Sequence, residues 1–326
     1  MTDTTLTLLS PSGALANAAQ LKRAAKRLGK LGFEVTIDEA ALLKDQRFAG
    51  DDDTRLAALH RVAKAAPSIA LATRGGYGLT RLLDHIDWKK IAKSVDKGTR
   101  WVGMSDFTAL QLGLLAHAKA PSWAGPVAYD DFGRADADGG VDDVTEGCFV
   151  EAMDGLLEAV GFRTEVGFDG LGVKGTLWGG NLAMVCSLLG TPHFPKIKNG
   201  ILFLEDVAEQ PFRVERMLMQ LRMAGVLDAQ KAIVLGEFSL WRKTEADRGY
   251  ELKHAVARLR SLTKTPILTG LPFGHVPTKV CLPVGRKAEL LVQGRDAFIG
   301  WAHGHHNHAD GHDHKHSHKD HDHHDH

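Results

Sequence analysis

One serine of the sequence stands where a nucleophile could be activated. Ser105 lies in Gly103-Met-Ser-Asp106, which follows a short apolar run and precedes a helical pattern. A serine on such a turn projects its hydroxyl beyond the sheet, and the amides at the helix start point at a bound group. The same residues also suit an ordinary helix N-cap, with Ser105 or Asp106 accepting the first free amides. Phe107 replaces the second glycine of a G-x-S-x-G elbow, so this motif alone does not decide between the two.

A histidine and a carboxylate further along the chain could complete a proton relay with this serine. His275 follows Gly274 in a loop punctuated by proline and glycine, and Glu205 and Asp206 follow the apolar run 201–204. A serine is a weak nucleophile until a base takes its proton, and a carboxylate can fix the tautomer of that base. The alternatives are an exposed loop histidine and an acidic pair that favours a helix start.

A glycine-rich loop offers backbone amides to a ligand. Arg74-Gly-Gly-Tyr-Gly78 follows an apolar run, and three glycines in four positions permit close approach of the backbone. Amides in such a loop can bind an anion or an oxyanion. The loop lacks the Gly-Lys-Ser/Thr of a P-loop and the G-x-G-x-x-G spacing of a dinucleotide site. The alternative is a tight strand-to-helix connection with Arg74 in solvent.

The elements that must position these residues predict an α/β fold. Strands and helices alternate strictly in the first 130 residues, which favours a parallel sheet with helices on both faces and ligands at the carboxyl ends of its strands. The predicted strands are 6–9, 33–37, 69–72, 101–103 and 127–128, and the predicted helices are 14–31, 54–66, 79–94 and 107–117.

A second domain is expected after an Asp- and Gly-rich stretch that reads as a surface linker. Its predicted strands are 201–204, 232–235, 267–268 and 288–292, and its predicted helices are 213–223 and 250–262. We therefore expect a flavodoxin-like N-terminal α/β domain carrying the nucleophile (1–135), a linker (136–172), a mixed α/β C-terminal domain (173–302) and a disordered His-rich tail (303–326).

Composition excludes several classes of protein. The 326 residues carry 40 basic and 40 acidic side chains, which gives no electrostatic argument for nucleic acid or an anionic membrane as partner. No run of about 18 apolar residues is present, so no membrane span is expected. The first residues do not fit a signal peptide, which predicts a cytoplasmic location. Cys148, Cys186 and Cys281 are far apart and are expected as reduced thiols in or near the core.

The tail could bind a transition metal. Twelve of the 18 histidines follow residue 302, mixed with aspartate, and imidazoles at this density suit Ni²⁺, Zn²⁺ or Cu²⁺. A cloning tag is the alternative, although no run exceeds two histidines. The candidate ligands are His305, His306, His308, His312 and His314.

Seven short strings, in order, resemble the LD-carboxypeptidases, also called muramoyltetrapeptide carboxypeptidases. They span most of the chain before the tail. The strings are Arg74-Gly-Gly-Tyr-Gly78, Gly103-Met-Ser-Asp106, Trp178-Gly-Gly-Asn181, Gly190-Thr-Pro192, Phe203-Leu-Glu-Asp206, Arg213-Val-Glu-Arg216 and Gly274-His275 through Leu282-Pro-Val-Gly285.

The resemblance implies roles for particular residues. It implies Ser105 as nucleophile, His275 as general base and Glu205 as the acid that orients it, in a cleft between the two domains. The amides of Gly76 and Asp106 are the candidates for an oxyanion hole. Arg74, Trp178 and Asn181 lie in the family's strings and are expected to line the substrate cleft. The resemblance requires no cofactor or catalytic metal and suggests a homodimer.

The implied activity is removal of the terminal D-alanine from muropeptide tetrapeptides in cell-wall recycling. An alternative within the same enzyme class is a serine peptidase that inactivates a peptide–nucleotide antibiotic of the microcin C type. An alternative from another class is a two-lobed module that closes on a ligand without catalysis.

Overall fold

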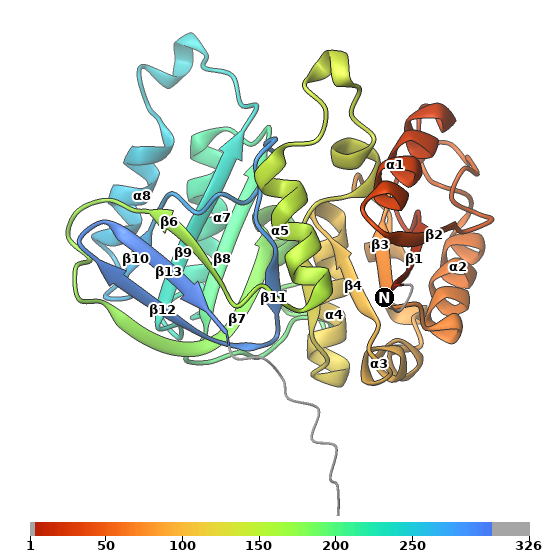
Figure 1. Cartoon of the computed structure of the whole chain (residues 1–326). Helices are drawn as coiled ribbons and strands as arrows, with labels where there is room; N and C mark the ends of the chain where they lie inside the picture. The colour runs from red at the N-terminus through yellow and green to blue at the C-terminus, as the bar shows by residue number, and fades with distance from the viewer. Residues whose placement is uncertain (1–3, 302–326) are drawn as a thin grey trace, which may run out of the picture.

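The computed structural model describes residues 4–301, which form two α/β lobes side by side, each built on its own sheet (Figure 1). The tail and its candidate metal ligands lie outside the described residues. This architecture confirms the predicted fold class. In the described part of the chain, no helix is long and apolar enough to cross a membrane.

The first sheet has the strand order of flavodoxin-like folds. Its strands run in the order β2-β1-β3-β4-β5-β11, and all pairs are parallel except that of β5 with β11. The strands are β1 (Thr4–Leu9), β2 (Phe33–Ile37), β3 (Ile69–Ala72), β4 (Arg100–Gly103), β5 (Ser122–Ala124) and β11 (Leu282–Val284). Because β11 comes late in the chain, the second half of the sequence completes the first sheet.

Amphipathic helices cover this sheet. In α1 (Ala18–Lys30), Leu21, Ala24 and Leu28 recur at helical spacing and are buried, and the Asn17 side chain caps the start by accepting from the Ala19 amide. The other helices of this lobe are α2 (Asp52–Ala65), α3 (Trp88–Asp96) and α4 (Thr108–Ala118), with 3₁₀ turns η1 (Leu79–Arg81), η2 (Leu83–His85) and η3 (Ser105–Phe107).

The second sheet is half parallel and half antiparallel, in the order β10-β9-β8-β7-β12-β13-β6. The long β7 joins the halves, since its first residues pair with β12 and its last with β8. The strands are β6 (Ala159–Arg163), β7 (Gly172–Asn181), β8 (Ile201–Val207), β9 (Ala232–Ser239), β10 (Ile267–Leu268), β12 (Lys287–Gln293) and β13 (Asp296–Gly300). The helices are α6 (Leu182–Ser187), α7 (Pro211–Met223) and α8 (Leu252–Arg260).

The structure corrects three predicted elements. The segment 136–172 is not only a linker, because it contains α5 (Asp143–Asp154) and strand β6 of the second sheet. Residues 127–128 do not form a strand; they lead into a π-helical turn, η4 (Ala128–Phe132), and the fifth strand is β5. The predicted helix 79–94 divides into η1, η2 and α3, because Asp87 caps a new helix through the Lys90 amide.

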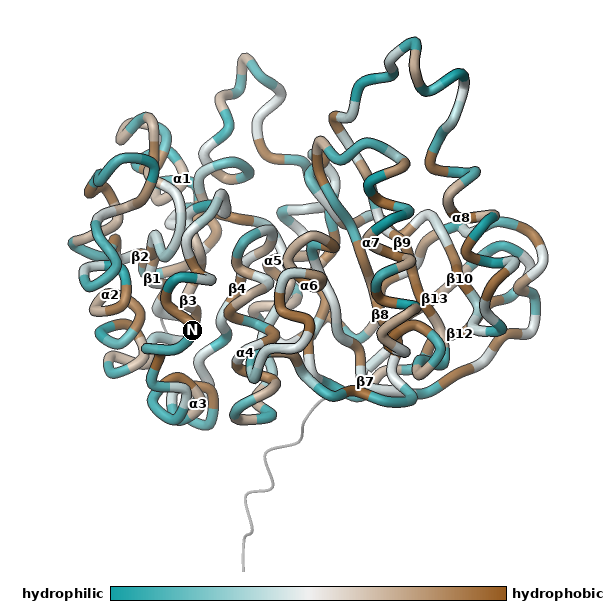
Figure 2. The backbone as a smooth tube through the Cα atoms, turned by 180° about the vertical axis from the view of Figure 1, so that it is seen from behind, coloured by the Kyte–Doolittle hydropathy of each residue, from teal (hydrophilic) through white to brown (hydrophobic). Residues whose placement is uncertain are grey.

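The apolar strands lie at the centre of each lobe, whereas the projecting loops before α5 and between β9 and α8 are largely hydrophilic (Figure 2). Every residue of β3 is buried, as are the first six of β8. All three cysteines are free and buried, as expected. Rigid strands in both sheets therefore support the loops that leave their carboxyl ends.

Candidate active site

A pocket of about 380 Å³ lies between the two lobes, at the carboxyl ends of the strands. Loops after β3, β4 and β5 contribute one side, and the last residue of β8 and the loop after β10 contribute the other. This is where ligands of open α/β sheets bind. The lining residues are Arg74, Gly75, Gly76, Met104, Ser105, Val127, Asp130, Asp131, Arg134, Val207, His275, Val276, Pro277 and Lys279.

Ser105 is the first residue of η3, on a strained turn that follows β4. Its φ is 64°, in the left-handed region that a non-glycine residue rarely adopts. Such strain clusters at active sites and is typical of a serine held at the tip of a strand-to-helix turn. Gly75 packs directly against it, since a Cβ at position 75 would lie 2.7 Å from the Ser105 Oγ.

The Asp106 side chain anchors this turn through hydrogen bonds to two other segments, so it does more than cap a helix. Its buried carboxylate accepts hydrogen bonds from the Ser12 hydroxyl at 2.7 Å and the Leu79 amide at 2.9 Å. These bonds tie the turn to the loops after β1 and β3. Burial raises the pKa of Asp106, while the bonds from Ser12 and Leu79 oppose that rise.

His275 and Glu205 both belong to the second lobe, and Glu205 holds the imidazole in place by a hydrogen bond. The His275 Nδ1 lies 2.8 Å from the Glu205 Oε2, and the Glu205 side chain is completely buried. An ionised carboxylate only accepts hydrogen bonds, so Nδ1 carries the proton and Nε2 of the neutral ring is left as a base. Gly274, with φ at 149°, leaves room for this pair, because a Cβ there would lie 3.3 Å from the Glu205 Oε2.

The surroundings of His275 favour its protonated form. Burial lowers the pKa of the imidazole, but the hydrogen bond and negative charge of Glu205, with the charge of Asp206, outweigh burial, so the pKa of His275 is raised. The imidazolium that forms when a base accepts a proton is stabilised by the same groups.

Asn181 contacts Glu205, the hydrogen-bond partner of His275. Its Nδ2 donates to Asp206 at 2.9 Å and to Glu205 at 3.3 Å, and its Oδ1 caps α6 through the Met184 amide. The residue is absent from the pocket lining. Asn181 therefore does not line the pocket, contrary to the expectation from its motif, and instead supports Glu205 by a hydrogen bond.

Trp178 is in the core of the second lobe. Its side chain is fully buried on β7, and its indole N–H donates to Gln230 at 3.0 Å. It does not line the pocket, contrary to the expectation from its motif, because β7 is buried from Leu177 to Asn181 and the indole packs inside the lobe. Arg74, in contrast, lines the pocket as expected.

The three expected catalytic side chains meet only in part. Ser105 and His275 line one pocket, and Glu205 bonds to His275. Between residues 4 and 301, no hydrogen bond joins the Ser105 hydroxyl to the imidazole. Catalytic hydrogen bonds are commonly long in the absence of substrate, so this geometry is compatible with a relay. Gly76 also lines the pocket, and Asp106 follows the serine directly.

Sequence reasoning missed four charged residues of the pocket: Asp130, Asp131, Arg134 and Lys279. The first three lie in and just after η4, directly before the Asp- and Gly-rich stretch that was predicted as a surface linker. Lys279 carries no local motif, and only its buried ion pair with Asp131 identifies it.

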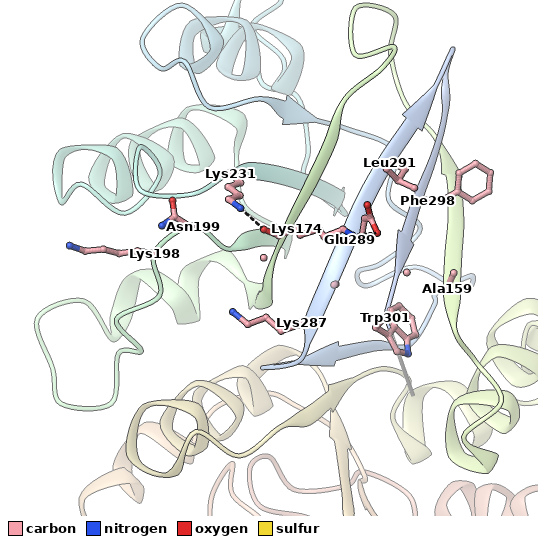
Figure 3. Close-up of a pocket in the computed structure, with 13 residues that line it drawn as sticks. Ala159, Lys174, Lys198, Asn199, Lys231, Lys287, Glu289, Leu291, Phe298 and Trp301 are labelled. Carbon is pink, nitrogen blue, oxygen red and sulfur yellow. Dashed lines mark hydrogen bonds and ion pairs between the residues drawn. The ribbon is translucent and has the colours of Figure 1, made fainter. Parts of the chain in front are cut away.

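A second hollow, of about 870 Å³, is larger and lies on the sheet formed by β7, β12 and β13 (Figure 3). Ser105 is not among its lining residues. Lysines surround it, and Leu291, Phe298 and Trp301 give it an apolar side. It holds no candidate nucleophile or base. Nor do the residues that the structure describes contain a cluster of metal-ligating side chains. Of these two, only the smaller pocket therefore has both a candidate nucleophile and a candidate base in its lining.

A strained serine facing a carboxylate-oriented histidine across a two-lobed cleft defines a serine hydrolase. Comparison with known proteins gives the family. Residues 6–125 match the LD-carboxypeptidase N-terminal domain, and residues 174–290 match the LD-carboxypeptidase C-terminal domain. The chain belongs to the LD-carboxypeptidase family and is a hydrolase acting on peptide bonds.

Individual relatives agree with this assignment. The crystal structure of muramoyltetrapeptide carboxypeptidase from Oxalobacter formigenes superposes with a TM-score of 0.82 at 39% identity, covering 91% of this chain and 98% of that one. A Synechocystis sp. protein whose name places it among the carboxypeptidases is 31% identical over 87% of this chain and 90% of its own. The murein tetrapeptide carboxypeptidase of Pseudomonas aeruginosa is 28% identical over 88% of this chain and 93% of its own.

Proposed function

We propose that the protein removes the terminal D-alanine from muropeptide tetrapeptides, with Ser105, His275 and Glu205 as its catalytic triad. The observation that carries this proposal is the bond between Glu205 and His275 in the pocket that also holds the strained Ser105. The names of the relatives from Oxalobacter formigenes and Pseudomonas aeruginosa support the substrate.

In the first half of the proposed reaction, the Ser105 Oγ attacks the carbonyl of the bond before the terminal D-residue. The His275 Nε2 accepts the hydroxyl proton and passes it to the leaving D-alanine nitrogen, so that an acyl-enzyme and a free amine form. The backbone N–H groups of Gly76 and Asp106 are the proposed donors to the oxyanion, each typically contributing about 3 kcal/mol to catalysis.

In the second half, water replaces the amine. The His275 Nε2 takes a proton from the water as it attacks the acyl carbonyl, and then returns that proton to the Ser105 Oγ. Glu205 keeps the imidazole oriented through both halves. The products are a tripeptide and D-alanine.

The direct test is release of D-alanine from a muropeptide tetrapeptide by wild-type and Ser105→Ala protein. We expect wild-type turnover and a loss of at least about 10³-fold in the variant, since the nucleophile is gone. Equal rates for the two proteins remove Ser105 from the role. Binding without any turnover by the wild type favours instead a two-lobed module that closes on its ligand.

A second candidate substrate is a peptide–nucleotide antibiotic. The microcin C7 self-immunity protein of Escherichia coli is 26% identical over 67% of this chain, against 28% over 88% of this chain for the Pseudomonas aeruginosa enzyme. A solved structure of a microcin C7 self-immunity protein covers 93% of this chain but is only 22% identical, against 39% for the Oxalobacter formigenes enzyme. The higher identity of the murein enzymes favours the muropeptide. Competition between the two substrates for one wild-type preparation decides between them, because the preferred one suppresses turnover of the other.

We also propose that the enzyme works in the cytoplasm as a homodimer. The family resemblance supports the dimer, and an intracellular muropeptide substrate supports the location. Light scattering on the purified protein measures its mass, and fractionation of cells that produce it locates the chain. A monomer at all accessible concentrations contradicts the first, and recovery outside the cytoplasm contradicts the second.

A further inference from the structure

Two charged side chains of the pocket, Lys279 and Asp131, neutralise each other. Lys279 forms an ion pair with Asp131, and each of the two side chains is only 4% exposed. Asp131 also accepts a hydrogen bond from the Val127 amide at 2.8 Å. A buried charge with its partner in place has little reason to bind another ion. This pair therefore shapes the wall of the pocket between η4 and the histidine loop.

Three other charged side chains of the pocket have no such partner. Asp130, Arg74 and Arg134 form no ion pair with any residue in the range 4–301. The Arg74 Nη1 donates only to the Ala14 carbonyl at 3.3 Å, and its buried Nε has no acceptor. Two cationic groups and one anionic group are thus available to a ligand.

Asp130 is the neighbour of Asp131 in η4 but differs from it in environment. Its side chain is accessible from the pocket, although the protein surrounds it closely enough that burial raises its pKa, against the opposing charge of Arg74. Asp130 and His275, the proposed base, line the same pocket, and the charge of His275 acts on Asp130. A group bound by Asp130 therefore lies close to the bond that is cut.

We propose that Asp130 determines specificity by binding an ammonium group on the side chain of the residue that precedes the scissile bond, while Arg74 and Arg134 bind the carboxylates of the peptide. This inference rests on the proposed peptidase function. The scissile nitrogen is an uncharged amide, so the ammonium belongs to a diamino acid that supplies the attacked carbonyl. A carboxylate that faces the pocket without an ion-pair partner binds such a cation through charge-assisted hydrogen bonds.

The test compares two tetrapeptides that end in D-alanine and differ at one group. One has lysine before the terminal residue, and the other has Nε-acetyl-lysine, which keeps the length but removes the charge. For wild-type protein we expect kcat/KM to favour the lysine peptide by about 10- to 100-fold, the usual worth of a hydrogen bond to a charged group. For Asp130→Asn we expect that ratio to fall to about one.

Two further variants make the result specific. Asp138→Asn removes an exposed carboxylate of the same segment that lies outside the pocket, and it should keep the wild-type ratio. Asp130→Glu restores a negative charge and should recover part of the preference. Circular dichroism and a melting curve for each variant show whether it is folded.

The outcomes separate the two proposals. If the wild-type protein cleaves neither peptide, the peptidase proposal fails and this inference fails with it. If the wild type cleaves both peptides at equal kcat/KM, or if folded Asp130→Asn keeps the preference for lysine, the role of Asp130 is overturned while the peptidase proposal stands.

Discussion

The two sides of the catalytic pocket are held in place by different kinds of interaction. On the N-terminal side, backbone geometry positions Ser105: a φ of 64° and close packing against Gly75. On the C-terminal side, side-chain hydrogen bonds position His275, in the series from Asn181 to Glu205 to His275. In the proposed reaction, the first side supplies the nucleophilic oxygen at a fixed position, and the second supplies a base whose charge changes.

This difference predicts which kind of substitution each side tolerates. A backbone-held nucleophile should be sensitive to added volume and indifferent to nearby charge. A base held by charged partners should be sensitive to loss of charge even when the shape is kept. Isosteric and small steric substitutions therefore test the comparison, from the largest expected effect to the smallest.

The largest effect is expected for Glu205→Gln. The variant keeps the shape but removes the charge that fixes the His275 tautomer and stabilises the imidazolium, and a corresponding change in a serine protease triad lowers kcat about 10⁴-fold. We expect a loss of about 10³-fold or more in D-alanine release. The matched control is Glu34→Gln, an exposed glutamate on the edge strand β2 of the first sheet, which should retain wild-type activity. A loss of less than tenfold at Glu205 contradicts its role.

A smaller effect is expected for Gly75→Ala. The new Cβ would lie 2.6 Å from the Ser105 Cβ and 2.7 Å from its Oγ, so the nucleophile must shift. A displacement of about 1 Å can cost about 100-fold in rate, and we expect a decrease of that order in kcat. Gly29→Ala, in α1 with nothing within 4 Å of the added Cβ, is the control and should be fully active. Full activity of a folded Gly75→Ala protein shows that the turn is not fixed.

A still smaller effect is expected for Asn181→Ser. Serine retains the cap of α6 but loses the Nδ2 that donates to Glu205 and Asp206. The loss of one hydrogen bond behind the base should lower kcat/KM by about tenfold. Asn17→Ser makes the same change at the cap of α1, far from the site, and should leave kcat/KM unaffected. Equal values for the two variants rule out support of Glu205 by Asn181.

Local patterns in the sequence sufficed for four of the six strands of the first sheet, β1 to β4, and for the family. Alternating strands and helices up to residue 118 predict a parallel sheet, because short buried strands such as 69–72 leave few other arrangements. The pattern could not show that β11 returns from the second half to pair with β5, since that contact joins residues about 160 positions apart. Residues 136–172 were misread because the Asp–Gly stretch at its start concealed α5.

For the site, motifs identified residues but not where their side chains point. Trp178 and Asn181 share one string, yet one packs in the core and the other bonds to Glu205. The string gives no indication of this, because the direction of a side chain depends on its place along β7. The ion pair of Lys279 with Asp131 has no sequence signal either, since it depends on the approach of two loops.

The smallest expected effect is a shift in the pH dependence of kcat/KM, which distinguishes the Ser105 side of the pocket from the His275 side. His275 must be neutral to act as base, so the rate should rise with pH through its pKa in the free enzyme. Burial lowers that pKa, but Glu205 and Asp206 together raise it by more than burial lowers it. The midpoint of the profile should therefore lie above the ordinary value of 6.5. Burial raises the pKa of Asp206 to about 6, so its charge is largely present where His275 titrates.

Removing the charge of Glu205 should move this midpoint downward, whereas adding volume at Gly75 should not move it, although both variants are slow. The pH profiles of residual kcat/KM for Glu205→Gln and Gly75→Ala check this directly, with the wild-type profile as reference. A downward shift in both variants shows that the serine side also controls the charge of the base. An unchanged midpoint in Glu205→Gln shows that Glu205 does not set the pKa of His275. Either of these two outcomes contradicts the division of the pocket into a steric side and an electrostatic side.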